Sequence, residues 1–171
     1  KLESLLLHRV DTYPSHVVAG HHVRQGSPIP FGARSIAGGV NFAIHSAHAT
    51  SCTLVLYERD QPGPMAEIPF PQEFRIGNVY TMFVFGIDPD RIEYGFRLGG
   101  PFLPVEGHRF DEKNVVLDPY ARLVSGRDTW GGSEKAVGYR GRLAPAVDDV
   151  AALARPALVH RMSLSFGARA E

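Results

Sequence analysis

The sequence contains side chains that could bind a metal, but they are not spaced like the ligands of one metal site. Eight histidines occur in the 171 residues. His21 and His22 are neighbours in a predicted loop, whereas His45 and His48 lie three apart at the end of a predicted strand, where alternate side chains point to opposite faces. A zinc site needs ligands that converge on one point. The pattern therefore predicts no metal ligands and no cofactor.

Catalytic chemistry is not indicated either. Cys52 alternates with Leu54 and Leu56 on one face of a predicted strand, and this pattern favours a buried structural thiol over a reactive one. Asp88 and Asp90 fall in one predicted turn, where they cannot flank a substrate as an acid–base pair. We therefore predict no catalytic residue in this chain.

Trp130 is the most informative aromatic residue. It lies in the sequence DTWGG, and an exposed indole beside glycines can stack on a sugar ring while its N–H donates a hydrogen bond. The alternative is a structural role, in which Trp130 packs against the C-terminal edge of the domain. The residues alone leave both roles open.

The composition excludes several classes of protein. Hydrophobic residues make up 44% of the chain and charged residues 21%, as in ordinary globular domains. Lys plus Arg and Asp plus Glu are balanced at 18 each, so no net charge attracts nucleic acid or anionic lipid. No apolar run of about 18 residues could span a membrane, and the first ten residues do not form a secretory signal. With a single cysteine, a cytoplasmic protein is the expectation.

Apolar residues that alternate with period two predict β-strands through the middle of the chain. The pattern covers residues 40–44, 52–56, 78–87 and 92–98. Asp-Pro-Asp-Arg at 88–91 is typical of a type I turn, and we expect it to join its neighbouring strands as a hairpin. The apolar run 114–117 predicts a strand that ends at Asp118, because the following proline fixes φ and lacks an N–H donor.

The remaining segments are predicted to lie outside these strands. Residues 59–71 contain four prolines and are predicted to be a loop. Residues 1–31 resemble an extended, turn-rich lead-in, and 146–154 carry a short helical pattern. Several short strands joined by turns predict an all-β protein, an immunoglobulin-like antiparallel β-sandwich with irregular N- and C-terminal flanks.

Five segments together resemble a known family. They are GSPIPFGA (26–33), GVNFAIHSAHATSCTLVLYE (39–58), GNVYTMFVFGI (77–87), IEYGFRLGGPF (92–102) and GHRF…VVLDPYARLVSG (107–126). In this order they look like the N-terminal module of isoamylase-type glycogen-debranching enzymes, which resembles carbohydrate-binding module family forty-eight. Those enzymes belong to the α-amylase superfamily, glycoside hydrolase family thirteen.

The resemblance implies a division of the chain. Residues 1–31 would be the lead-in, 32–130 the β-sandwich module, and 131–171 a linker or tail that leads toward a catalytic (β/α)8 barrel. A barrel of this kind needs about 250 residues, and the catalytic carboxylates of the superfamily lie in it, so this chain alone is predicted to be inactive. In the full enzyme the resemblance implies hydrolysis of α-1,6 branch linkages by a retaining, two-carboxylate mechanism.

The resemblance also implies partners and binding residues. Sugar-binding members of the related kinase-subunit type use a tryptophan pair and a lysine that follows a tyrosine. Here Gly95 follows Tyr94, and Phe102 stands roughly where one tryptophan would. We therefore predict Trp130, Tyr94 and Phe102 as contacts for an α-glucan, such as glycogen or a maltooligosaccharide, bound weakly if at all. The second implied partner is the catalytic barrel of the same enzyme.

Two other functions remain open at this point. The chain could be a stand-alone glycogen-binding or regulatory module, which would make it a binding protein and not a part of an enzyme. It could also be a structural interaction domain that binds no sugar.

Overall fold

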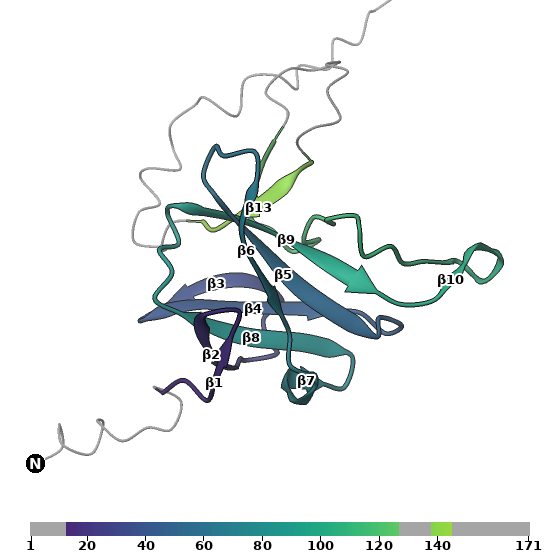
Figure 1. Cartoon of the computed structure of the whole chain (residues 1–171), viewed down its shortest axis with the longest axis horizontal. Helices are drawn as coiled ribbons and strands as arrows, with labels where there is room; N and C mark the ends of the chain where they lie inside the picture. The colour runs from purple at the N-terminus through teal and green to yellow at the C-terminus, as the bar shows by residue number, and fades with distance from the viewer. Residues whose placement is uncertain (1–12, 127–137, 145–171) are drawn as a thin grey trace, which may run out of the picture.

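Two antiparallel β-sheets pack face to face in the computed structural model, which describes residues 13–126 and 138–144 (Figure 1). The strands of the first sheet are β1 (His16–Val18), β2 (His21–Gln25), β3 (Gly32–Ile36), β4 (Gly39–His45), β7 (Arg75–Ile76) and β8 (Val79–Phe85). Those of the second are β5 (Ser51–Glu58), β6 (Pro64–Pro69), β9 (Ile92–Gly99), β12 (Leu123–Ser125) and β13 (Arg140–Arg142). The predicted all-β sandwich is confirmed.

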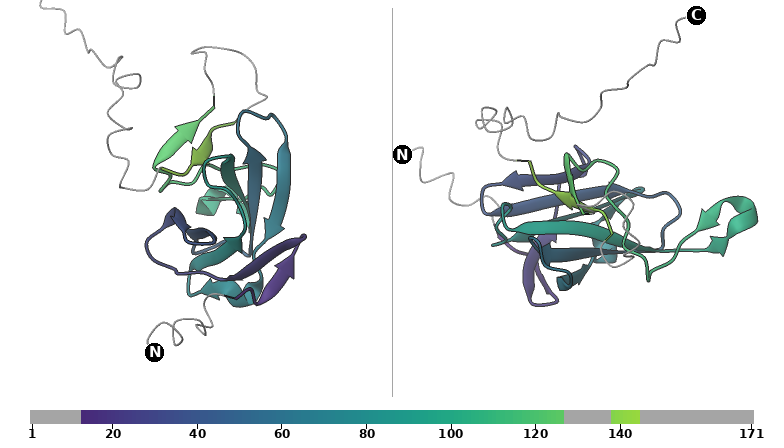
Figure 2. Two further views of the ribbon diagram at one scale, coloured as in Figure 1. Left: turned by 90° about the vertical axis from the view of Figure 1, so that its left-hand side faces the viewer. Right: turned by 90° about the horizontal axis from the view of Figure 1, so that it is seen from above.

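The order of the strands shows how the chain moves between the sheets. The first sheet runs β1-β2-β8-β4-β3, with β7 also paired to β8, and the second runs β12-β13-β9-β5-β6. A separate hairpin of β10 (Phe102–Leu103) and β11 (His108–Arg109) belongs to neither sheet and projects from the sandwich (Figure 2). Within the described residues no helix has the length and apolar character of a membrane span.

Apolar side chains from the central strands fill the space between the sheets. The alternation read from the sequence places them on the two inner faces, and burying each one stabilises the fold by about 1.5–3 kcal/mol. Cys52 lies among them, and burial raises the pKa of its thiol far above the ordinary value, as expected for a structural cysteine. The largest fully buried members of this core are Tyr80, Tyr94, Phe42, Phe96, Leu54, Leu56, Ile68 and Met82.

The outer face of the first sheet is also covered, and its residues Asn41, Thr81 and Phe83 are buried. Residues 26–31 cross it, and Asn41 holds them by accepting a hydrogen bond from the Ser27 N–H (2.8 Å) and donating one to the Ser27 carbonyl (3.0 Å). The Thr81 hydroxyl donates to the same carbonyl at 2.8 Å. Gly26 is required here, because a Cβ at this position would overlap the side chains of Asn41 and Thr81. The described part of the predicted lead-in, residues 13–31, therefore belongs to the sandwich.

The predicted loop at 59–71 is wrong in its centre, where β6 forms. Among the strands that the structure describes, β6 pairs only with β5 and forms the edge of the second sheet. Its prolines, Pro64 and Pro69, stand at its two ends. An edge strand tolerates proline, because one row of its backbone N–H groups has no partner strand. A count of prolines could not distinguish this arrangement from a loop.

Two further predictions about connections need correction. The turn at 88–91 exists, with Asp88 accepting the Asp90 N–H through Oδ1 at 3.0 Å, but it carries the chain from β8 in the first sheet to β9 in the second and makes no hairpin. The predicted strand at 114–117 is a single bridge, in which Val116 and Phe96 exchange backbone hydrogen bonds of 2.7 and 3.0 Å. Periodicity identifies a strand, but it does not name the partner strand.

A buried ion pair attaches β13 to the sandwich. The Arg140 guanidinium lies 3.3 Å from the Glu93 carboxylate, with both side chains no more than 6% exposed. It also donates to the carbonyls of Gln61 and Pro62, at 2.6 and 2.8 Å, and stacks 3.6 Å above the ring of Tyr57.

The strands extend beyond the predicted module at 32–130 in both directions. β1 and β2 precede residue 32, and β13 follows residue 130. The helical pattern at 146–154 lies outside the described residues.

Arg140→Met should lower the free energy of unfolding by about 3–5 kcal/mol, because it leaves the Glu93 carboxylate buried without its cation. Arg91→Met is the matched control, since it removes an exposed pair with Glu58 and should cost no more than about 1 kcal/mol. Urea unfolding monitored by circular dichroism measures both variants. Equal losses for the two variants would contradict a role for Arg140 in anchoring β13.

Candidate functional site

The LDPYA segment, residues 117–121, forms a tight turn around Asp118. One carboxylate oxygen of Asp118 accepts the Tyr94 hydroxyl at 2.8 Å, and the other accepts the Tyr120 N–H at 2.9 Å. The Ala121 N–H donates to the Asp118 carbonyl at 3.1 Å. Asp118 is 1% exposed. The predicted end of the apolar run is therefore a turn fastened to the core.

After Asp118 the chain contacts the covering segment, residues 26–31, which crosses the outer face of the first sheet. The rings of Tyr120 and Phe31 are 4.9 Å apart, tilted by 50°. Gly32 lies against the backbone of Tyr120 with a φ of +93°, a conformation and a spacing that favour glycine. The turn thus joins the start of β3 to the segment that leads into β12.

Tyr94 has a structural position and not the exposed one that its predicted sugar contact requires. It is 1% exposed, and its ring packs edge-on against Phe42 at 5.3 Å and Phe96 at 5.9 Å. Burial, with the neighbouring Asp118 carboxylate as a smaller cause, raises the pKa of Tyr94 above its ordinary value. The prediction failed because alternation along β9 directs Tyr94 into the core, where a stacked sugar cannot reach it.

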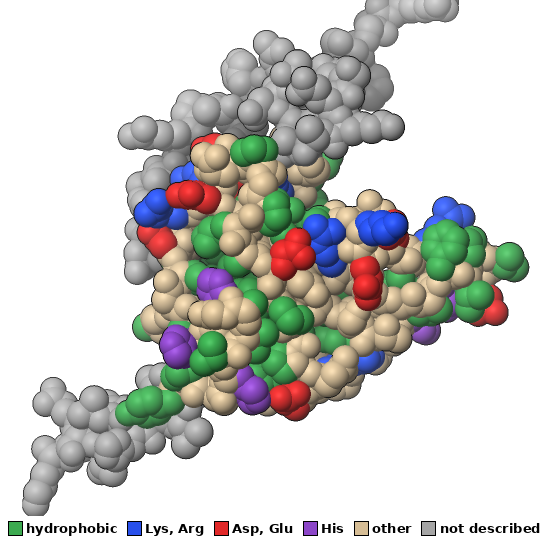
Figure 3. All heavy atoms as spheres, in the orientation of Figure 1, with side chains coloured by type: hydrophobic (Ala, Val, Ile, Leu, Met, Phe, Trp, Pro, Cys, Tyr) green, Lys and Arg blue, Asp and Glu red, His purple; other side chains and the backbone are tan. Residues whose placement is uncertain are grey.

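An open polar hollow of about 540 Å³ lies on the outer face of the second sheet. Figure 3 shows acidic and basic side chains close together on this face. The hollow is lined by Ser51, Thr53, Glu67, Arg97, Glu112 and Lys113. It lies beside the point where the projecting hairpin leaves β9.

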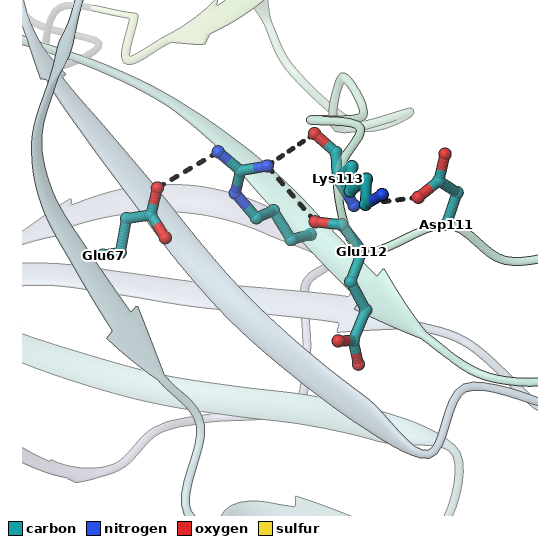
Figure 4. Close-up of polar contacts among 5 residues, drawn as sticks. Glu67, Asp111, Glu112 and Lys113 are labelled. Carbon is teal, nitrogen blue, oxygen red and sulfur yellow. Dashed lines mark hydrogen bonds and ion pairs between the residues drawn. The ribbon is translucent and has the colours of Figure 1, made fainter.

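Arg97 organises the hollow from the middle of β9. Its guanidinium donates to the backbone carbonyls of Glu112 (3.2 Å) and Lys113 (2.6 Å) and lies 3.1 Å from the carboxylate of Glu67 (Figure 4). The Ser51 hydroxyl donates to Glu112 at 2.8 Å. Arg97 on β9 therefore connects β6, which carries Glu67, with the turn that carries Glu112 and Lys113.

The turn that carries Glu112 and Lys113 is fixed independently by Asp111. One carboxylate oxygen of Asp111 accepts the Lys113 N–H at 3.0 Å (Figure 4). The other accepts the Asn114 side-chain amide at 2.7 Å. The Lys113 side chain is thus carried on a braced turn at the rim of the hollow. Carboxylates, a hydroxyl and cations in one open depression suit hydrogen bonding to a polyhydroxylated ligand.

The structure does not bring the three predicted sugar contacts together. Phe102 is 66% exposed on β10, so its ring is accessible, and its predicted role stays a prediction. Tyr94 is buried, and Trp130 lies outside the described residues. Among residues 13–126 and 138–144, no group of three or more histidine, cysteine, aspartate or glutamate side chains is arranged to hold a metal ion.

The residues of the hollow escaped the sequence analysis for identifiable reasons. Arg97 carried a usable signal, because Tyr94 and Phe96 face the core, so residue 97 must point outward from a central strand. Glu67 was hidden by the loop prediction for 59–71. Glu112 approaches Arg97 only because of the turn at 111–114, and the alternation of apolar residues in the sequence does not predict such a turn.

Comparison with known proteins agrees with this architecture. The family model described as carbohydrate-binding module 48 (isoamylase N-terminal domain) matches residues 30–121, more than half of the chain. The chain belongs to this family. The match begins within residues 26–31 and ends at the turn around Asp118, so it includes the central strands of both sheets and the hollow, but not β1, β2, β12 or β13.

Relatives of this carbohydrate-binding module 48 chain are much longer proteins. It is 38% identical to isoamylase 3 of Oryza sativa subsp. japonica over 117 residues, which cover 64% of this chain and 15% of that protein. It is 39% identical to the glycogen debranching enzyme of Yersinia pseudotuberculosis over 102 residues, which cover 60% of this chain and 15% of that enzyme. The chain therefore spans a small part of the relatives it matches.

A solved structure shares the fold of the module. The pullulanase from Bacillus acidopullulyticus superposes with a TM-score of 0.51 over 69% of this chain and 12% of that protein. The sequences are 16% identical over this match, so the likeness concerns the fold alone.

The stability of the turn around Asp118 should depend on pH in a defined direction. Burial raises the pKa of Asp118, although the hydrogen bonds from the Tyr120 N–H and the Tyr94 hydroxyl oppose the shift. The folded state therefore favours the protonated acid, and the stability that Asp118 contributes is complete below its unfolded pKa and is lost as the pH rises through the folded pKa.

The measurement compares the free energies of unfolding of the wild type and Asp118→Asn from about pH 7 to about pH 4. The difference should move in favour of the wild type as the pH falls. Tyr94→Phe should extend this dependence to higher pH and cost about 1–3 kcal/mol, because it removes a hydrogen bond that stabilises the buried carboxylate. A difference that does not change with pH would contradict the assignment.

Proposed function

We propose that this module is the non-catalytic, glucan-associated N-terminal domain of a glycogen-debranching enzyme that hydrolyses α-1,6-glucosidic bonds. The observation that carries the proposal is the family match over residues 30–121, together with identity of 38–39% to an isoamylase and a glycogen debranching enzyme. In this function the sandwich supports a catalytic domain of the same polypeptide and presents part of the surface that faces the glucan. We take the module to extend from residue 13 to at least Arg142.

The hollow around Arg97 is the proposed contact for the glucan. A glucose unit offers hydroxyl groups that donate and accept hydrogen bonds, and the Glu67 carboxylate and the Lys113 ammonium can engage both kinds. Phe102 adds an exposed ring at the base of the projecting hairpin, on which an apolar sugar face can stack. The affinity should be weak, because an open surface does little to offset the cost of immobilising a flexible sugar chain.

Substitutions of the proposed glucan contacts, in the hollow and on β10, should weaken retention on glycogen. Lys113→Ala and Phe102→Ala are each expected to reduce it about 2- to 10-fold, the effect of losing about 0.5–1.5 kcal/mol of contact energy. Affinity electrophoresis in gels with and without glycogen measures the effect, and Met65→Ala, on an exposed site of β6, is the control. Failure of the wild type to be retained would contradict glucan binding by this module.

Purified 171-residue protein should release no reducing ends from glycogen or amylopectin. The resemblance to the α-amylase superfamily places the catalytic carboxylates in a (β/α)8 barrel, and the described residues form only the sandwich. A reducing-sugar assay on branched glucan tests this expectation. Debranching by the pure chain would refute the non-catalytic assignment.

A further inference from the structure

The projecting hairpin ends in an apolar tip. Residues 102–109, the arm, comprise β10, the short 3-10 helix η4 (Pro104–Glu106) and β11, with Gly107 completing the turn at a φ of +85°. The register pairs Phe102 with Arg109 and Leu103 with His108. Leu103 is 48% exposed and Val105 is fully exposed. Figure 3 shows hydrophobic side chains gathered at this end of the molecule.

The base of the arm is braced, in contrast to its tip. The rings of His48 and His108 are 4.5 Å apart, and His108 stacks on Phe110 with 6.4 Å between centroids. Gly100 lies so close to the Phe110 ring that a side chain at this position would overlap it. A two-stranded hairpin alone is only marginally stable, so these contacts hold the arm in a defined direction.

We propose that the Leu103–Val105 tip of the arm docks on the catalytic domain of the same polypeptide, an inference that rests on the proposed function. Exposed aliphatic side chains on a braced projection are typical of an interaction surface, because little conformational entropy is lost when such a surface is covered. The matched region is 15% of the isoamylase and debranching relatives, so most of such a protein lies outside the sandwich and can cover the arm.

Two other occupants fit the tip less well. A sugar needs a planar ring and hydrogen-bonding groups, whereas Leu103 and Val105 offer neither, and Phe102 alternates to the other side of β10. A second copy of the chain would need about 800 Å² of surface from each partner, and an arm of this length cannot supply that area alone. A neighbouring domain needs less area, because the linkage raises its effective concentration.

Hydrogen exchange tests the proposal on two forms of the protein, the 171-residue chain and the polypeptide in which it is joined to its catalytic domain. The amides of Leu103, Val105, Glu106 and Gly107 should exchange at least about 10-fold more slowly in the joined form, since docking removes them from solvent. The peptide around Met65, on edge strand β6, should exchange equally in both forms. Equal exchange of the arm in the two forms would overturn the proposal.

The double variant Leu103→Glu, Val105→Glu should abolish this protection while the core strands keep their wild-type exchange, which verifies folding. Its retention on glycogen should equal that of the wild type. Loss of retention, or protection of the arm by maltoheptaose in the chain alone, would assign the tip to glucan and overturn docking. If the wild type is not retained on glycogen, glucan binding fails, but the exchange comparison still decides the role of the arm.

Discussion

The hydrogen bond from the Tyr94 hydroxyl to the Asp118 carboxylate fixes the point at which the chain leaves the sandwich. Both groups are buried, so each would be left without a partner if the other were lost, and an unpaired buried polar group is costly. Asp118 in turn holds the Tyr120 N–H, and Tyr120 packs on Phe31. This contact in the core therefore links the turn, the segment that leads into β12 and the Phe31 end of residues 26–31.

Much of the fold could be predicted from the sequence, because burial imposes a period of two on a strand. The alternation located β4, β5, β8 and β9 to within a few residues. Alternation does not assign strands to sheets, so it predicts a hairpin at 88–91, where the chain in fact passes from β8 in the first sheet to β9 in the second. It also missed β6 and the short strands of the flanks, where edge pairing and single anchoring side chains decide the structure.

The candidate site was less predictable for a related reason. Tyr94 and Arg97 belong to the same strand, and alternation along β9 separates them into a core residue and a surface residue. Aromatic stacking on sugars favours Tyr94 as the contact when only the sequence is considered, whereas the structure brings an arginine, two carboxylates and a hydroxyl together. Contacts such as Arg97 with Glu67 join segments distant in sequence, and only the folded chain reveals them.

Two neighbouring residues on opposite faces of β9, Glu93 and Tyr94, hold the two segments next to it: the turn that precedes β12, and β13. Tyr94 points into the core and binds Asp118, which precedes β12, whereas Glu93 points outward and pairs with Arg140 at the start of β13. β13 itself pairs with β9 at these two positions, with Gly141 opposite Tyr94 and Arg142 opposite Glu93. Replacing buried polar pairs with apolar ones often costs no stability, so the value of these pairs lies in geometry. A hydrogen bond or an ion pair specifies direction, and the two together fix both segments on the sandwich.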